Sequence, residues 1–172
     1  MGRDKASIPV SGVAMARRIA LRLQEAGIRP TVLGSEPIED LPFQRDLNAH
    51  EGPLAALRHF KPEAVFVFVA ACDLPHFDAG VVAVLKERLG DVHASVPSVE
   101  GRLQPLCALY RADALDQLAK PPLETARSMR EFLDTLRVVE VPEAAFAGLH
   151  PHCLRSANSQ EELEELLGED AG

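Results

Sequence analysis

The stretch that most constrains this fold is residues 64–75, AVFVFVAACDLP. Its first eight residues are apolar without alternation, and most are β-branched or aromatic. Such a run is typical of a central parallel strand that is buried on both faces, with helices packed above and below. Pro75 prevents the strand from continuing. Asp73 is therefore expected at the carboxyl end of a central strand, where open α/β sheets bind their ligands.

Two interpretations of Asp73 follow from this position. A carboxylate at a strand end can hold a metal ion or a ligand that carries phosphate. Asp is also a common cap of the turn and helix that follow a strand, and this role requires no ligand. The position of Asp73 alone does not decide between these roles.

Length and composition limit the class of protein. A chain of 172 residues with 47% hydrophobic residues fits one domain with a full core. The net charge of −8 argues against sequence-independent binding of nucleic acid, but it permits one nucleotide with its metal. The three cysteines are widely spaced and read as reduced thiols of a cytoplasmic protein. No signal peptide or 18-residue apolar span is present, so we expect a soluble protein that does not enter a membrane.

Apolar periodicity and breaker residues predict an alternation of helices and strands. Helices are predicted over residues 13–26, 54–60, 78–89, 113–118, 125–136 and 159–167. Strands are predicted over residues 29–34, 64–71, 93–97, 103–110 and 138–141. Pro105 makes the strand at 103–110 an antiparallel or edge strand. The pattern as a whole predicts an α/β domain with a mostly parallel sheet.

Three further segments carry candidate chemistry. Gly2-Arg3-Asp4-Lys5 combines flexible backbone with cations, as a phosphate-binding loop does, although a solvated terminus has the same composition. Residues 36–51 lack periodicity, and long loops of this kind are often functional. Asp78 is a predicted helix N-cap, and Ser159 with Glu162 forms a predicted capping box.

The order of the motifs resembles the MobA-type molybdenum cofactor guanylyltransferases of the nucleotidyltransferase superfamily. The matching motifs are MGRDKA at residue 1, GPLA at 52, CDLP at 72, GR at 101, QPLCALY at 104, SMREFL at 128 and NSQEEL at 158. The resemblance covers nearly the whole chain and implies a single three-layer, Rossmann-like nucleotidyltransferase domain over residues 1–172.

The resemblance also implies a reaction and its site. The family transfers GMP from GTP to the phosphate of molybdopterin and releases pyrophosphate, with Mg²⁺ as cofactor. Lys5 and Asp73 are the implied catalytic residues, and Asp73 is the implied metal ligand. The implied nucleotide-binding residues are Lys5, Asp46, Gly52, Pro53 and Asp73. The implied acceptor-binding residues are Arg102, Arg130 and Asn158, although Arg130 could equally be a surface arginine on a helix.

The chain departs from the family at its beginning. Family members start with a strand, a Leu-Ala-Gly-Gly turn and an Arg-rich loop before the Met-Gly-x-Asp-Lys phrase, whereas Met1 is already the Met of that phrase. The first strand and the Gly-rich loop are thus absent relative to the family, and that strand would pair with residues 64–71. Each buried backbone group left unsatisfied costs roughly 1–3 kcal/mol. The departure has three explanations: a misplaced start, an N-terminus that pairs in another way, or a loss of catalysis.

Two alternative functions remain open from the sequence. One is a related nucleotidyltransferase that uses CTP or a phosphosugar acceptor, and the other is a non-catalytic, cofactor-binding homologue. Gly101-Arg102, Gln104-Pro105 and the motif at Asn158 favour the molybdopterin branch. The expected partners are GTP and molybdopterin, and no nucleic acid or membrane is expected to bind. We expect the protein to be a monomer or a weak homo-oligomer.

Overall fold

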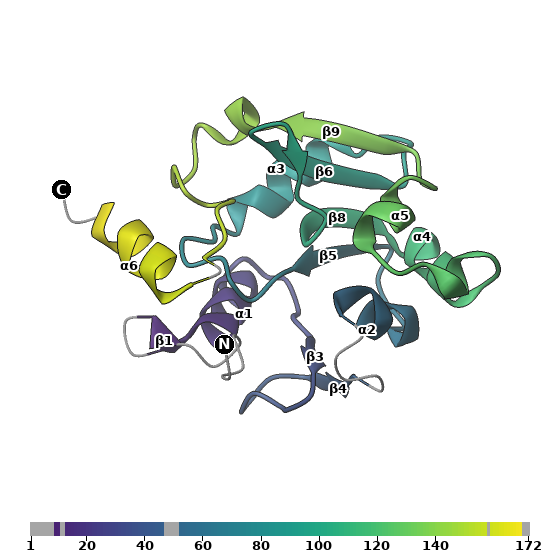
Figure 1. Cartoon of the computed structure of the whole chain (residues 1–172), viewed down its shortest axis with the longest axis horizontal. Helices are drawn as coiled ribbons and strands as arrows, with labels where there is room; N and C mark the ends of the chain where they lie inside the picture. The colour runs from purple at the N-terminus through teal and green to yellow at the C-terminus, as the bar shows by residue number, and fades with distance from the viewer. Residues whose placement is uncertain (1–8, 11–12, 47–51, 158, 170–172) are drawn as a thin grey trace.

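The computed structural model describes residues 9–10, 13–46, 52–157 and 159–169. Its main sheet has five strands in the order β5-β8-β6-β7, and β9 pairs with β6 (Figure 1). These strands are β5 (Phe66–Ala70), β6 (Ala94–Val99), β7 (Arg102–Leu103), β8 (Cys107–Arg111) and β9 (Val138–Pro142).

Three of the long strands point the same way. β8 is antiparallel to both β5 and β6, whereas β6 and β9 are parallel. β5, β6 and β9 therefore share one direction, and β8 runs against them. The antiparallel strand predicted from Pro105 is confirmed. It is shorter than predicted, because the amide of Cys107 donates to the carbonyl of Gln104 (3.0 Å) in a turn that separates β8 from β7.

Helices cover both faces of this sheet. One face packs against α1 (Met15–Glu25) and α3 (Gly80–Arg88), and the other packs against α2 (Pro53–His59), α4 (Ala112–Asp116) and α5 (Met129–Leu133). Alternate side chains of β5 enter the two layers: Phe66 and Phe68 contact the first core, and Val67 and Val69 belong to the second. The predicted three-layer α/β fold is confirmed.

The prediction for the strand at residues 64–71 needs correction. The strand is Phe66–Ala70, Val65 is 67% exposed, and Phe66 and Phe68 are only half-buried. β5 lies at the end of the sheet, and its one neighbour among the strands described is the antiparallel β8. It is therefore an edge strand in this part of the chain and not a central parallel strand.

Two further elements differ from the prediction. Residues 36–51, predicted as a loop, contain strand β4 (Phe43–Arg45), which pairs in parallel with β3 (Val32–Gly34) in a separate small sheet. The helix predicted over 125–136 begins only at Met129, because the extended Ser128 caps it by accepting the amide of Glu131 (3.1 Å). A 3₁₀ turn, η3 (Leu123–Thr125), precedes this helix.

The remaining elements lie around the sheet. They are the hairpin strands β1 (Pro9–Val10) and β2 (Val13–Ala14), the 3₁₀ turns η2 (Gln117–Ala119) and η4 (Glu143–Phe146), and the final helix α6 (Gln160–Glu169). Within the ranges described, no helix has the length and apolar run that a membrane crossing requires.

Candidate functional site

Asp73 lies in the turn that follows β5, and its side chain is half-buried. The amide of Phe77 donates to the carbonyl of Leu74 (3.2 Å) within this turn, and the guanidinium of Arg22 in α1 donates to the carbonyl of Phe77. The N-cap of α3 is Ala79, and one residue earlier Oδ1 of Asp78 accepts the amide of Gly80 (2.8 Å). The prediction of Asp78 as the N-cap is therefore wrong by one residue, and Asp73, earlier in the turn, is not the cap of α3 either.

The C-terminal segment contacts this strand end directly. The amide of Ala157 donates to the main-chain carbonyl of Asp73 (2.8 Å), so the segment that ends at Ala157 reaches the turn after β5. Asn158 itself, like Lys5, lies outside the residues that the structure describes. Sequence order gave no sign of this contact, because it joins two distant segments through main-chain atoms.

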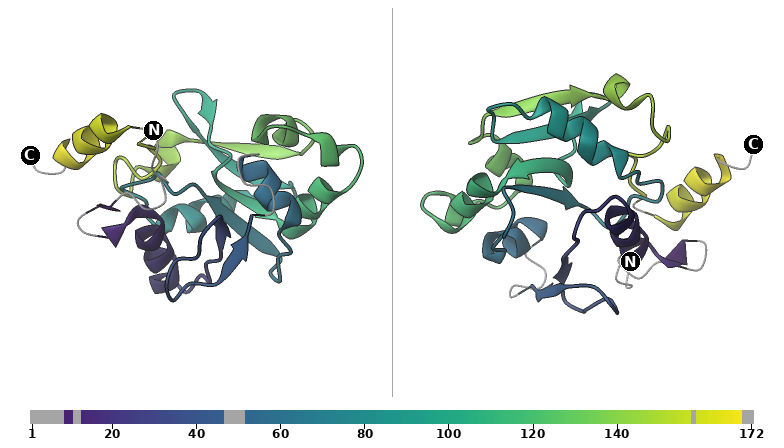
Figure 2. Two further views of the ribbon diagram at one scale, coloured as in Figure 1. Left: turned by 60° about the horizontal axis from the view of Figure 1, so that its bottom comes forward. Right: turned by 180° about the vertical axis from the view of Figure 1, so that it is seen from behind.

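Helix α6 is fixed beside the same turn. Nε2 of the buried His76 donates to the carbonyl of Leu166 (3.0 Å). Leu163 and Leu166 pack with Met15 at the start of α1 and with Ala157. Figures 1 and 2 show α1 and α6 together at the end of the molecule toward which β5 points. The predicted capping box starts this helix, since Ser159 Oγ accepts the amide of Glu162 (3.1 Å) and the Glu162 carboxylate accepts the amide of Ser159 (3.3 Å).

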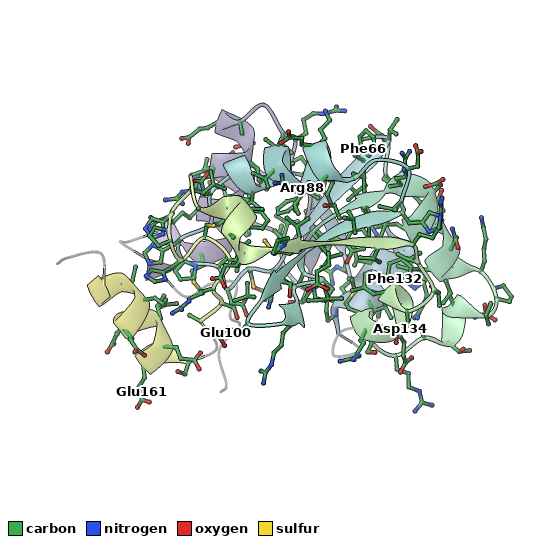
Figure 3. The ribbon with its side chains drawn as sticks, turned by 90° about the horizontal axis from the view of Figure 1, so that it is seen from above. Phe66, Arg88, Glu100, Phe132, Asp134 and Glu161 are labelled. Atoms are coloured by element: carbon green, nitrogen blue, oxygen red, sulfur yellow. The ribbon has the colours of Figure 1, made fainter. Side chains whose placement is uncertain are left out.

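A cavity of about 300 Å³ lies between the β6–β7 hairpin and α6. Its lining residues are Val99, Glu100, Gln104, Leu154, Arg155, Ser156, Glu162, Glu165 and Leu166. Figure 3 shows Glu100 beside α6, the helix that carries Glu161. The hairpin tip is a two-residue turn in which Glu100 (φ 50°) and Gly101 (φ 74°) both have positive φ, as a type I′ turn requires. Gln104 was predicted only as part of a motif, and among the α6 carboxylates only Glu162 had a predicted role, in the capping box.

Three imidazoles cluster next to the Asp73 turn. The rings of His76 and His150 stack at 4.4 Å with an interplanar angle of 2°, and the ring of His152 lies 6.1 Å from His76 and 5.9 Å from His150. His150 and His152 lie between η4 and α6, outside any helix or strand. In the described ranges, no three His, Cys, Asp or Glu side chains are placed to share a metal ion. The cluster packs around His76, which anchors α6.

The predicted nucleotide residues lie at the ends of other elements. Asp46 follows β4, and its amide donates to the carbonyl of Gly34 at the end of β3 (2.8 Å). Gly52 precedes α2 with φ 82° and ψ 177°, and Pro53 is the first residue of that helix. These residues therefore lie at a strand end and at the start of a helix, and their binding roles stay predictions.

The two predicted acceptor arginines lie in different places. Arg102 is exposed on β7, in the hairpin that forms one wall of the cavity. Arg130 is exposed on α5, which lies at the opposite end of the molecule from α6 (Figures 1 and 2). The structure thus brings Arg102, but not Arg130, to the end of the molecule that holds α6.

The cysteines are free thiols and are not placed as nucleophiles. Cys107 and Cys153 are buried, and Cys72 is half-buried. Burial, with a smaller contribution from Cys153, raises the pKa of the Cys107 thiol far above its usual value. Burial, with the nearby carboxylate of Asp78, raises the pKa of Cys153 to about 11. Both buried thiols are protonated at neutral pH and are therefore poor nucleophiles.

The fold and the strand-end turn define an open α/β domain of the class that binds ligands at the carboxyl ends of its strands. Residues 1–141 match the model of the MobA-like NTP transferase domain, and the chain belongs to this family.

Named relatives agree with this membership. A probable molybdenum cofactor guanylyltransferase of Clostridium perfringens is 31% identical over 102 residues, which are 56% of this chain and 50% of the relative. Another protein of that name, from Bacillus cytotoxicus, is 26% identical over 180 residues, covering 96% of this chain and 89% of the relative. The match therefore spans about half the length of the first relative and most of the second.

Solved structures share the fold. Molybdopterin-guanine dinucleotide biosynthesis protein A from Archaeoglobus fulgidus has a TM-score of 0.79 at 18% identity, with 99% of this chain and 92% of that chain covered. The 2-C-methyl-D-erythritol 4-phosphate cytidylyltransferase from Thermus thermophilus has a TM-score of 0.70 at 15% identity, with 98% and 94% covered. At these identities the likeness concerns the fold alone.

Proposed function

We propose that this protein is a nucleotidyltransferase that transfers GMP from GTP to the phosphate of the molybdenum cofactor and releases pyrophosphate. The observation that carries the proposal is the contact between the Asp73 turn and the Ala157 segment, in a chain of the MobA-like family. That contact unites the segment proposed to hold metal with the segment proposed to meet the acceptor phosphate. Two relatives named as probable molybdenum cofactor guanylyltransferases support the choice of substrates.

The residues fit a magnesium ion as cofactor. Magnesium in phosphoryl-transfer sites takes one or two carboxylates and completes its shell with water and substrate phosphates. Asp73 supplies such a carboxylate at a strand end and would hold the ion. When bound, the ion would neutralise charge on the phosphates of the nucleotide.

The chain's own residues would position the two substrates. We assign Lys5, Asp46 and the Gly52-Pro53 turn to the nucleotide, and Arg102 and Asn158 to the acceptor. A cationic side chain such as Lys5 would stabilise the negative charge on the phosphates during transfer. This charge stabilisation and the alignment of the acceptor phosphate with the α-phosphorus account for most of the expected rate enhancement.

Substitution of Asp73 tests the proposal. In an assay of pyrophosphate release with GTP, Mg²⁺ and molybdopterin, Asp73→Asn is expected to lower kcat about 100-fold or more, the range for a group that stabilises transition-state charge. Asp134→Asn, an exposed aspartate after α5, makes the same chemical change away from the site and is the control. Equal activity of Asp73→Asn and wild type would remove Asp73 as the metal anchor.

The nucleotide is tested in the same assay. The structural likeness to a cytidylyltransferase makes CTP the second candidate. We expect GTP to bind in the presence of Mg²⁺ and CTP to bind at least tenfold more weakly by calorimetry. The reverse preference would favour the cytidylyl branch. Absence of binding by either nucleotide would support the non-catalytic, cofactor-binding alternative.

A further inference from the structure

We propose that the cavity between the β6–β7 hairpin and α6 binds the flat, nitrogen-rich ring of the acceptor, a pterin, in the orientation that directs its phosphate toward Asp73. This inference rests on the proposed function, because it names where one of the two substrates of that reaction binds. The motifs connect Gln104 with the molybdopterin branch without giving it a binding role, and they leave Arg155 and Glu165 out. The cavity brings these three residues together.

The position of the cavity supports this assignment. Arg155 and Ser156 line it, and the next residue, Ala157, donates its amide to the carbonyl of Asp73 (2.8 Å). One wall of the cavity therefore continues directly into the turn that would hold the metal. A ligand bound in the cavity could therefore extend its phosphate-bearing arm along this wall to the turn at Asp73.

The size and the apolar part of the cavity suit a planar ring. Its volume of about 300 Å³ lies at the lower end of small-molecule pockets, which span roughly 300–1,000 Å³. Leu154 and Leu166 are buried and contribute apolar surface, against which the face of a ring can pack. Leu166 is also held in place, because its carbonyl accepts from His76.

The polar lining matches the edge of a pterin. A pterin presents an amide N–H beside an exocyclic amino group, and a carboxylate can accept both hydrogen bonds at once. Glu162 is occupied by the capping box, so we assign this role to Glu165, which lies one turn further along the same face of α6. The side-chain amide of Gln104 donates through Nε2 to the carbonyl of Arg102 (3.2 Å), which leaves its Oε1 as a second acceptor.

The charges of the lining fit the two halves of such a ligand. The carboxylates of Glu100 and Glu165 favour a ring edge rich in N–H donors and disfavour a bare phosphate. Arg155, in the wall that leads to Ala157 and Asp73, is the cation of the lining and would contact the phosphate end. The ligand would therefore lie with its ring toward α6 and the hairpin.

Binding of a free pterin tests the inference without turnover. The probe is 6-hydroxymethylpterin, titrated into the full chain with Mg²⁺ and followed by quenching of pterin fluorescence. Glu165→Gln and Gln104→Ala are each expected to weaken binding about tenfold, the loss typical of one buried hydrogen bond. Glu161→Gln removes a charge from the exposed first turn of α6, outside the cavity, and is expected to change binding less than twofold.

The outcomes separate this inference from the proposed function. GTP binding is measured by calorimetry on the same proteins and should be unchanged in Glu165→Gln. If wild type binds GTP but not the pterin, or if Glu165→Gln and Gln104→Ala bind the pterin as wild type does, the cavity assignment is overturned and the transferase proposal stands. If wild type binds the pterin and the two variants weaken it, the assignment stands even when no nucleotide binds.

Discussion

Gly52 has a backbone conformation that other residues rarely adopt. Its φ of 82° and ψ of 177° lie in a region that is essentially restricted to glycine. A Cβ added there would meet nothing within 4 Å, so packing does not require the glycine. The need for glycine at the start of α2 is thus a property of the backbone turn itself.

Substitution of this glycine should therefore destabilise the fold through backbone strain. Gly52→Ala is expected to lower the free energy of unfolding by about 1–3 kcal/mol, measured by urea denaturation. Gly148→Ala is the matched control, because Gly148 also has open space around a Cβ and lacks a positive φ. The control should be neutral or stabilising by up to about 1 kcal/mol. Equal stability of the two variants would show that the turn before α2 relaxes without cost.

Single residues were predicted from sequence where their role depends on neighbours in the chain. The Ser159–Glu162 capping box follows a local rule, and the structure confirms it. Asp78 was predicted by the same kind of rule, and it lies one residue before the N-cap Ala79. The contact of Ala157 with Asp73 could not be predicted, because any residue can donate its backbone amide. Side-chain identity therefore gave no signal for the interaction that joins the two halves of the candidate site.

Among the elements, β5 has two chemically different edges. The carbonyl of Val65 accepts from Ala112, and the amide of Ala71 donates to Leu106, so backbone groups of odd-numbered residues face β8. The backbone groups of Phe66, Phe68 and Ala70 face the opposite edge. No strand in the described part of the chain pairs with that edge.

Amide hydrogen exchange measured by NMR should distinguish the two edges. The amides of Val67 and Val69 are expected to exchange slowly, because they donate to β8, whereas those of Phe66, Phe68 and Ala70 should exchange at least tenfold faster. Slow exchange at all five amides would contradict this expectation. It would mean that another segment or a second copy of the chain pairs with β5, as an exposed strand edge permits.

Element types were easier to predict than element limits. Periodicity identified α1, α3 and α6 because each buries a continuous apolar face. It missed β4, since a three-residue strand, Phe43–Arg45, is too short to show alternation. It overestimated α5: Met129, Phe132 and Leu133 give the helical spacing, but Ser128 is the N-cap and the helix begins at Met129, four residues after the predicted start.

At the scale of the whole molecule, three buried groups are expected to lower the free energy of unfolding as the pH becomes alkaline. Burial raises the pKa values of Cys107 and Tyr110 strongly and that of Cys153 to about 11. The folded state therefore keeps protons that the unfolded state begins to lose above about pH 8.5. Stability from each group is fully present below its unfolded pKa, about 8.5 for the cysteines and about 10 for Tyr110, and above that pH it decreases by up to about 1.4 kcal/mol per pH unit.

Cys107→Ala tests this dependence. The variant is expected to be less stable than wild type at pH 7, because it leaves a small cavity in the core. Its deficit in unfolding free energy relative to wild type should shrink between pH 8.5 and pH 10.5. Wild type loses stability over this range because the Cys107 thiol ionises in the unfolded state and stays protonated in the folded state, and the variant lacks this thiol. A deficit that stays constant over this pH range would contradict the assignment.

The layered architecture was predictable, and the cavity was not. Alternating helices and strands require helices on both faces of a sheet, and β5, β6 and β9 with their covering helices follow that rule. The cavity depends on how the β6–β7 hairpin and α6 approach each other across a large sequence distance. Local patterns do not encode such an approach, so only the assembled chain reveals Gln104 and Glu165 as neighbours.

The anchoring of α6 has a kinetic consequence. The hydrogen bond from His76 to Leu166 joins residues that are 90 positions apart, and closing so large a loop is entropically costly until the intervening sheet is in place. Contacts of high sequence separation form late and slow the folding of a domain. The turn at Asp73 should therefore be completed in the last phase of folding, so that catalytic competence would lag behind the recovery of secondary structure in a refolding experiment.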